Sequence, residues 1–149
     1  MSLEDLYREV IIDHYRSPRN RDELADPTAT AEGVNPLCGD EVTLQIKMDD
    51  GTVDEISVRG QGCSISQSSA SMMSDIVKGK SREEIAEIMS KFKAMMDIES
   101  DGTTVIDPDK PGSILGDLEA LYGVRKFPVR IKCANLPWTT LSEALESAR

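Results

Sequence analysis

The feature that most constrains the fold is a stretch in which apolar and polar residues alternate. A single group of turn residues interrupts it. Every second side chain from Val42 to Met48 is apolar, and apolar residues resume from Val53 to Val58. The Asp-Asp-Gly sequence at 49–51 is typical of a tight turn. Alternation buries one face of a strand, so this stretch predicts an antiparallel hairpin whose second strand ends near Gln61.

Helical spacing replaces the alternation on both sides of this hairpin. Before it, apolar residues recur every three or four positions until Ser17 and Pro18 end the run. After it, Ser81 and Glu84 form a capping-box pattern, and Gly123 is expected to end a short helix. The expected helices cover residues 3–16, about 64–78, 82–96, 114–122 and about 134–148.

Two further segments complete the predicted architecture. Residues 28–34 are expected to add an edge strand, and the acidic segment 97–112 is expected to be a surface loop or insertion. Strands followed by helices predict an α+β fold, with a small three-stranded antiparallel sheet and helices packed on one face. With 149 residues and no internal repeat, the chain is expected to form a single domain, 1–149.

The composition argues against several classes of partner. The formal charge is -10, and an acidic surface repels polyanions, so nucleic acid is not an expected ligand. No apolar run is long enough to span a bilayer, and the first ten residues lack the pattern of a signal peptide. A cytoplasmic protein without a membrane partner is therefore expected. Its three cysteines should be reduced in that compartment, and they would be either core residues or reactive thiols.

The three cysteines are all expected at turns or at the starts of elements. Cys38 lies in a Pro/Gly turn two residues before Asp40, Cys63 follows the hairpin, and Cys133 is expected just before the last helix. A helix N-terminus favours thiolate over thiol. Three thiolates and a carboxylate suit zinc or an iron–sulfur cluster. Because no C-x-x-C pair is present, ordinary core packing of the cysteines and a backbone-capping role for Asp40 stay open.

Three other positions have a structural and a functional interpretation. Arg130 and Lys132 would ordinarily be solvated surface residues, but three thiolates, a carboxylate and a divalent metal sum to about -2, which nearby cations would stabilise. His14 is expected to be a packed, hydrogen-bonded residue rather than a ligand. Without a histidine partner, the serines between Ser66 and Ser71 do not indicate a Ser-His nucleophile.

Several motifs resemble one family in order and context. NPLCGD at 35–40, GQGCSISQSSASMM at 60–73 and FPVRIKCANLPW at 127–138 are similar to the IscU/NifU-N family of iron–sulfur cluster assembly proteins, as is DHYRSPRN at 13–20. The chain looks like the SufU branch, because Lys132 stands where the IscU branch has histidine and the segment between the second and third cysteines is longer.

Two departures from the family pattern have consequences. KFPVR at 126–130 differs from the LPPVK tract by which IscU proteins engage an Hsp70 chaperone, so that interaction is not expected here. Pro137 stands where SufU-like sequences often have alanine, and it is expected in the first turn of the last helix, where proline is tolerated.

The resemblance implies a zinc protein whose ligands are Cys38, Asp40, Cys63 and Cys133. Its expected partner is a SufS-type pyridoxal-phosphate cysteine desulfurase. A desulfurase histidine would replace Cys38 as ligand, and Cys38 would then attack the desulfurase persulfide and pass the sulfur to a SufBCD-type assembly scaffold. Two alternatives stay open: a scaffold that assembles and transfers a [2Fe-2S] cluster on the same four residues, and a non-catalytic zinc module that only docks a partner.

Overall fold

The computed structural model describes residues 3–97, 106–107 and 109–148 of the chain. Within these residues the chain forms three strands, four α-helices and one 3-10 helix, which is labelled η1. In chain order they are α1 (Leu3–Arg16), β1 (Ala29–Asn35), β2 (Asp40–Asp49), β3 (Thr52–Gln61), α2 (Ser64–Val77), α3 (Arg82–Met96), η1 (Gly116–Lys126) and α4 (Pro128–Ser147).

The sheet is an antiparallel meander of the three strands in the order β1-β2-β3. Asp50 and Gly51 join β2 to β3 with positive φ values of 51° and 80°, which is the backbone that a tight hairpin turn requires. At the other end of β2, Asn35 pairs with Asp40, so only four residues connect β1 to β2. The hairpin and the edge strand expected at 28–34 are thus both confirmed.

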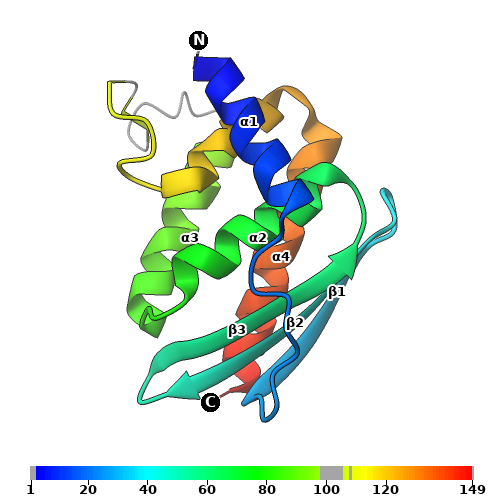
Figure 1. Ribbon diagram of the computed structural model, residues 1–149, viewed down its shortest axis with the longest axis vertical. Helices are drawn as coiled ribbons and strands as arrows, with labels where there is room; N and C mark the ends of the chain where they lie inside the picture. The colour runs from blue at the N-terminus through cyan, green and yellow to red at the C-terminus, as the bar shows by residue number, and fades with distance from the viewer. Residues whose placement is uncertain (1–2, 98–105, 108, 149) are drawn as a thin grey trace.

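The helices cover one face of this sheet, as Figure 1 shows. Helix α4 packs against β1 and β2, while α2 packs against β3, α4 and α1. Three of the alternating side chains of β2, Val42, Leu44 and Ile46, are buried, and Phe92 of α3 stacks on Trp138 of α4 with ring centroids 5.1 Å apart. This arrangement confirms the predicted α+β fold.

The capping box at the start of α3 is also confirmed, since Ser81 and Glu84 exchange side-chain hydrogen bonds with each other's backbone N–H groups. The expected end of the short helix at Gly123 is wrong, because η1 continues to Lys126. A 3-10 helix has three residues per turn, and buried apolar residues recur here every three positions. They are Leu115, Leu118, Leu121 and Val124.

The expected start of the last helix near Ala134 is wrong as well. Helix α4 begins at Pro128, six residues earlier, with Phe127 as its N-cap. Proline suits the first helical position because its fixed φ is helical and its missing N–H would have had no helical partner there. Cys133 therefore lies inside the helix, and Pro137 lies in its interior instead of its first turn.

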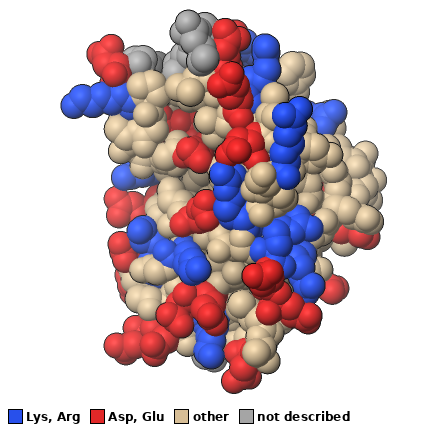
Figure 2. Space-filling view, viewed as in Figure 1, with Lys and Arg blue, Asp and Glu red and all other residues tan. Residues whose placement is uncertain are grey.

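Two expectations concern surface and loop regions. The loop or insertion expected over 97–112 lies largely outside the described residues, since 98–105 and 108 are not described. Within the described residues, no helix combines the length and the apolar character needed to cross a membrane. Figure 2 shows acidic and basic side chains interspersed over one face of the molecule, without a large patch of one sign.

Candidate metal centre

The four-residue connection between β1 and β2 carries Cys38. Asn35, the last residue of β1, accepts two hydrogen bonds from this turn. Its side-chain Oδ1 accepts from the Leu37 N–H at 3.3 Å, and its backbone carbonyl accepts from the Cys38 N–H at 3.2 Å. Gly39 completes the turn with a φ of +70°, which favours glycine. The turn leaves Cys38 half-buried at one end of the sheet.

Cys63 reaches the same end of the sheet because β3 is paired with β2. It is the N-cap of α2, as expected, and its backbone N–H donates to Asp40 Oδ1 at 2.9 Å. Gly62 has a φ of +145°, and a Cβ there would collide with Asp40. Only glycine therefore lets the chain pass so close to this carboxylate.

Cys133 approaches from the opposite side, on α4. It is fully buried, and its Sγ lies 3.2 Å from the Sγ of Cys38. Because it lies in the second turn of the helix, the expectation that the exposed N–H groups of a helix N-terminus favour its thiolate is wrong. Asn35 Nδ2 donates toward its sulfur at 3.7 Å.

Three of the four predicted ligands form a compact donor set. Ligand atoms of Cys38, Asp40 and Cys133 all lie within 4.8 Å of one another. Asp40 is fully buried, and its Oδ2 has no hydrogen-bond partner among the described residues. A buried carboxylate oxygen without a partner is costly, so this donor set fits a cation. Cys63 borders the set through its bond to Asp40, while its thiol points to Ser66 Oγ at 3.9 Å.

The protonation of the donor set follows from its burial. Burial raises the pKa of Asp40, but the hydrogen bond from the Cys63 N–H and the polar side chains of Cys133, Ser66 and Cys63 beside the carboxylate outweigh it and hold the pKa below its usual value. Burial also raises the pKa of the Cys133 thiol far above its usual value, and the neighbouring Asp40 carboxylate raises it further. Without a metal, the cluster thus pairs a carboxylate with a thiol, and a divalent cation would take the place of the thiol proton.

The two cations predicted to balance the site charge lie on its outside. Arg130 and Lys132 are exposed on α4, and neither forms an ion pair within the described part of the chain. Arg130 lines a surface groove of about 660 Å³ together with Ser64, Ile65 and Phe127. The structure therefore places Arg130 on a surface that includes Ser64 and Ile65 at the start of α2, and among the described residues no hydrogen bond or ion pair joins either cation to the ligand atoms.

Exposed apolar side chains lie close in the sequence to Cys38 and to Cys133. The four most exposed large apolar side chains of the described residues are Leu37, Val34, Phe127 and Val129, at 68%, 62%, 60% and 58%. The first two precede Cys38 in the sequence, and the other two lie at the start of the helix that carries Cys133. Exposed apolar groups gathered at one place mark an interaction surface.

Sequence reasoning missed two residues of this centre, Asn35 and Ser66. Asn35 precedes a proline at a strand end, where asparagine commonly bonds to the backbone two residues on. Ser66 lies three residues after the N-cap Cys63, and its hydroxyl donates to the Cys63 carbonyl at 3.1 Å. Both signals were present in the sequence, but neither indicates a metal centre by itself.

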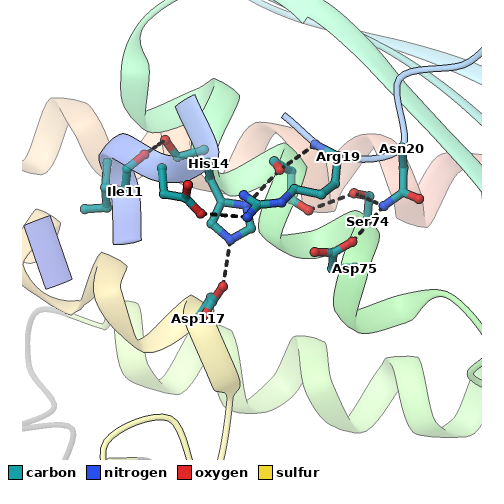
Figure 3. A network of polar contacts seen from close by, with 10 residues as sticks. Ile11, His14, Arg19, Asn20, Ser74, Asp75 and Asp117 are labelled. Carbon is teal, nitrogen blue, oxygen red and sulfur yellow. Dashed lines mark hydrogen bonds and ion pairs between the residues drawn. The ribbon is translucent and has the colours of Figure 1, made fainter. Parts of the chain in front are cut away.

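The interpretation of His14 as a packed residue is confirmed. It is 1% exposed, and its Nδ1 and Nε2 lie 2.8 Å from Ser71 Oγ and 2.7 Å from Asp117 Oδ2. Figure 3 shows this network, in which Asn20 also reaches Ser74. The network joins α1 to α2 and η1 and contains none of the predicted ligands.

Comparison with known proteins places this geometry in a family. The sequence model of the NifU-like N-terminal domain family matches residues 6–134. The chain belongs to this family. The expected resemblance to IscU/NifU-N proteins is thereby confirmed.

Two relatives align with nearly the whole chain. The zinc-dependent sulfurtransferase SufU of Bacillus subtilis (strain 168) is 42% identical over 144 residues, which cover 97% of this chain and 92% of the relative. The iron–sulfur cluster assembly scaffold protein IscU of Streptococcus pyogenes serotype M1 is 39% identical over 145 residues, with 97% and 85% covered. Members of the NifU-like family that resemble this chain thus carry two different functional names.

Solved structures agree on the fold. A crystal structure from Fervidobacterium islandicum AW-1, proposed as an iron–sulfur cluster assembly scaffold protein for the SUF system, has a TM-score of 0.80 and 31% identity, and the match covers 97% of this chain and 99% of that one. The N-terminal part of a NifU-like protein from Brucella abortus has a TM-score of 0.82 at 23% identity, covering 98% and 96%. The NifU-like fold is therefore shared across this range of sequence identity.

Proposed function

We propose that this NifU-like protein is a zinc-dependent sulfurtransferase of iron–sulfur cluster assembly. In this proposal Cys38 accepts persulfide sulfur from a SufS-type cysteine desulfurase and passes it to a SufBCD-type assembly scaffold in the cytoplasm. The relative named zinc-dependent sulfurtransferase supports this assignment over nearly the whole chain.

One observation carries the proposal, namely the unequal exposure of donors that lie side by side. Cys38 is half-buried on a short turn, directly after the exposed Leu37, whereas Cys133, 3.2 Å away, and Asp40 are fully buried. Cys63 is half-buried as well, but it is the N-cap of α2 and its backbone N–H is bonded to Asp40. Of the two half-buried thiols, Cys38 is thus the one on a turn between strands, where it can be released to a partner while the other donors stay in place.

Cys38, Asp40, Cys63 and Cys133 would hold the zinc. Thiolate and carboxylate donors are ordinary zinc ligands, and the unpartnered Oδ2 of Asp40 is a donor of the required kind. When bound, zinc would keep the thiols deprotonated and lower their nucleophilicity. Arg130 and Lys132 would offset the remaining negative charge from the surface.

The transfer step follows thiol–disulfide exchange chemistry. The Cys38 thiolate attacks the outer sulfur of the desulfurase persulfide, and a new S–S bond forms on Cys38. The S–S bond of the desulfurase breaks, and its cysteine leaves as a thiolate with the electron pair. The hydrogen of the persulfide stays with the transferred sulfur or is lost to water, so no external oxidant or reductant is needed.

The apolar surface around Cys38 and Cys133 gives the desulfurase a place to dock. Leu37 and Val34 on one side and Phe127 and Val129 on the other would be covered when the partner is bound. Burial of apolar side chains drives most protein association. Arg130, exposed beside them, would face the partner.

The deciding experiment measures the turnover of a SufS-type desulfurase as alanine formed from cysteine. The zinc-loaded wild type should stimulate turnover, and Cys38→Ala should abolish the stimulation. Ser90→Ala, an exposed substitution on α3, is the matched control and should behave as the wild type. No stimulation by a folded, zinc-loaded wild type would refute sulfur transfer.

A scaffold that assembles a [2Fe-2S] cluster is the second candidate. The relative from Streptococcus pyogenes named as a scaffold supports it, and the same cysteine and aspartate donors can hold iron, with the carboxylate making a cluster more labile. Anaerobic reconstitution tests it. A stoichiometric cluster that transfers to an apo-ferredoxin would favour the scaffold, and its failure beside strong desulfurase stimulation would favour the sulfurtransferase.

A further inference from the structure

Asn35 is the residue through which the Cys38 turn and the buried Cys133 are connected. Its side chain is 7% exposed at the end of β1. Its three polar groups all face the candidate centre: Oδ1 bonds to the turn, the backbone carbonyl bonds to Cys38, and Nδ2 lies 3.7 Å from the Cys133 sulfur.

The orientation of the Asn35 amide is fixed by its neighbours. The Leu37 backbone N–H can only donate, so it must face the Oδ1 atom and not Nδ2. This places the N–H donors of the same amide toward the sulfur of Cys133. The Asn35 side chain thus makes one contact through Oδ1 and one through Nδ2. If the two atoms exchanged places, both contacts would be lost.

We infer that Asn35 is a positioning residue of the metal centre, which holds the Cys38 turn against Cys133 and donates a hydrogen bond to the Cys133 thiolate. This inference rests on the metal-binding part of the proposed function. A donor beside a metal-bound thiolate stabilises its negative charge, and loss of such an outer contact typically lowers metal affinity about 10-fold to 100-fold. The role explains why a small buried amide stands at the start of this turn.

Two substitutions separate the two contacts. Asn35→Asp keeps an oxygen that accepts from the Leu37 N–H, but it replaces the donor to sulfur with a second acceptor of negative charge. Asn35→Ala removes both contacts. Gln45→Glu is the matched control, because Gln45 is also a buried amide of this sheet, is 9% exposed, and accepts from the Leu24 N–H at 3.0 Å.

The experiment measures zinc affinity by competition with a chromophoric chelator and records the thiolate-to-metal absorption bands of the cobalt-substituted proteins. We expect Asn35→Asp and Asn35→Ala to lower zinc affinity about 10-fold or more and to change the cobalt bands. Gln45→Glu should stay within about twofold of the wild type. Thermal unfolding of each metal-free protein gives the fraction of molecules that is folded, and each zinc affinity is calculated for that fraction.

The outcomes separate this inference from the proposed function. If the wild type binds zinc and both Asn35→Asp and Asn35→Ala bind it equally tightly with unchanged cobalt bands, the positioning role is refuted while the zinc site stands. If only Asn35→Ala loses affinity, the turn contact matters and the inferred bond to sulfur is refuted. If the folded wild type binds neither metal, the zinc site and the role of Asn35 both fail.

Discussion

The central side chains of two buried polar clusters, His14 and Asp40, differ in how completely their own polar atoms are paired. In the His14 cluster both ring nitrogens have partners, Ser71 and Asp117. In the cysteine cluster, Asp40 is equally buried, but its Oδ2 has none among the described residues. Both clusters join segments far apart in the chain. A cluster whose polar groups pair with one another fixes the fold, whereas one with an oxygen left over is suited to bind something.

The largest effect expected from this comparison concerns Asp40. Asp40→Asn keeps an oxygen for the Cys63 N–H but removes the charge and the free carboxylate oxygen. Zinc affinity should therefore fall about 100-fold or more, while the metal-free protein unfolds at nearly the wild-type urea concentration. Chelator competition and urea unfolding measure the two quantities. An affinity within about tenfold of the wild type would show that Asp40 is not a ligand.

His14→Ala should have the opposite pattern. The substitution leaves a cavity and deprives Ser71 and Asp117 of their partner, so the free energy of unfolding should fall by about 2–4 kcal/mol. Zinc affinity of the folded fraction should stay close to the wild-type value. Tyr15→Ala, at a neighbouring side chain that is 49% exposed, is the control and should cost much less. A loss of affinity as large as that of Asp40→Asn would remove the distinction between the clusters.

Gly62→Ala should affect fold and site together. The added Cβ would meet Asp40, and the φ of +145° is unfavourable for alanine. We expect a loss of about 1–3 kcal/mol in unfolding free energy and a weaker zinc site. Gly79→Ala is the comparison, because its φ is also positive, nothing lies within 4 Å of a Cβ there, and it is far in the sequence from the proposed ligands. Equal effects of the two substitutions on zinc affinity would contradict contact with Asp40.

The smallest effect concerns the loss of folding stability at low pH, to which Asp13, the residue before His14, contributes. A hydrogen bond from Arg19, and then its charge, hold the pKa of Asp13 below the usual 3.8. A lowered folded-state pKa adds stability above the unfolded-state value, which is lost as the pH falls through the folded-state value. Urea midpoints should therefore fall less for Asp13→Asn than for the wild type between about pH 5 and pH 2. Parallel curves would show that the pair adds nothing.

The parts of the fold predicted from sequence are those that short-range patterns determine. Alternation predicted the β2–β3 hairpin, and Ser81 with Glu84 predicted the start of α3. The last helix predicted from about residue 134 leaves out Pro128, although proline is favourable at a first helical position. The prediction that Gly123 ends the short helix assumes α-helical spacing, whereas η1 has a three-residue repeat that continues past Gly123 to Lys126.

The candidate centre depends on contacts that no local pattern contains. Cys38 and Cys133 are 95 residues apart, and their sulfur atoms meet only because α4 packs across β1 and β2. The residue types and their positions at turns allowed a metal hypothesis, and the resemblance gathered them into one set. The orphan oxygen of Asp40 and the double contact of Asn35 could be found only from coordinates.

The 3-10 helix has a consequence for how this segment can change in length. Its large buried apolar side chains recur every third residue, from Leu115 to Val124, and each added residue turns the chain by about 120°. Inserting or deleting one residue would rotate the following apolar side chains into water, whereas a change of three would restore them to the same face. Related chains that keep this helix should therefore differ in length here by multiples of three.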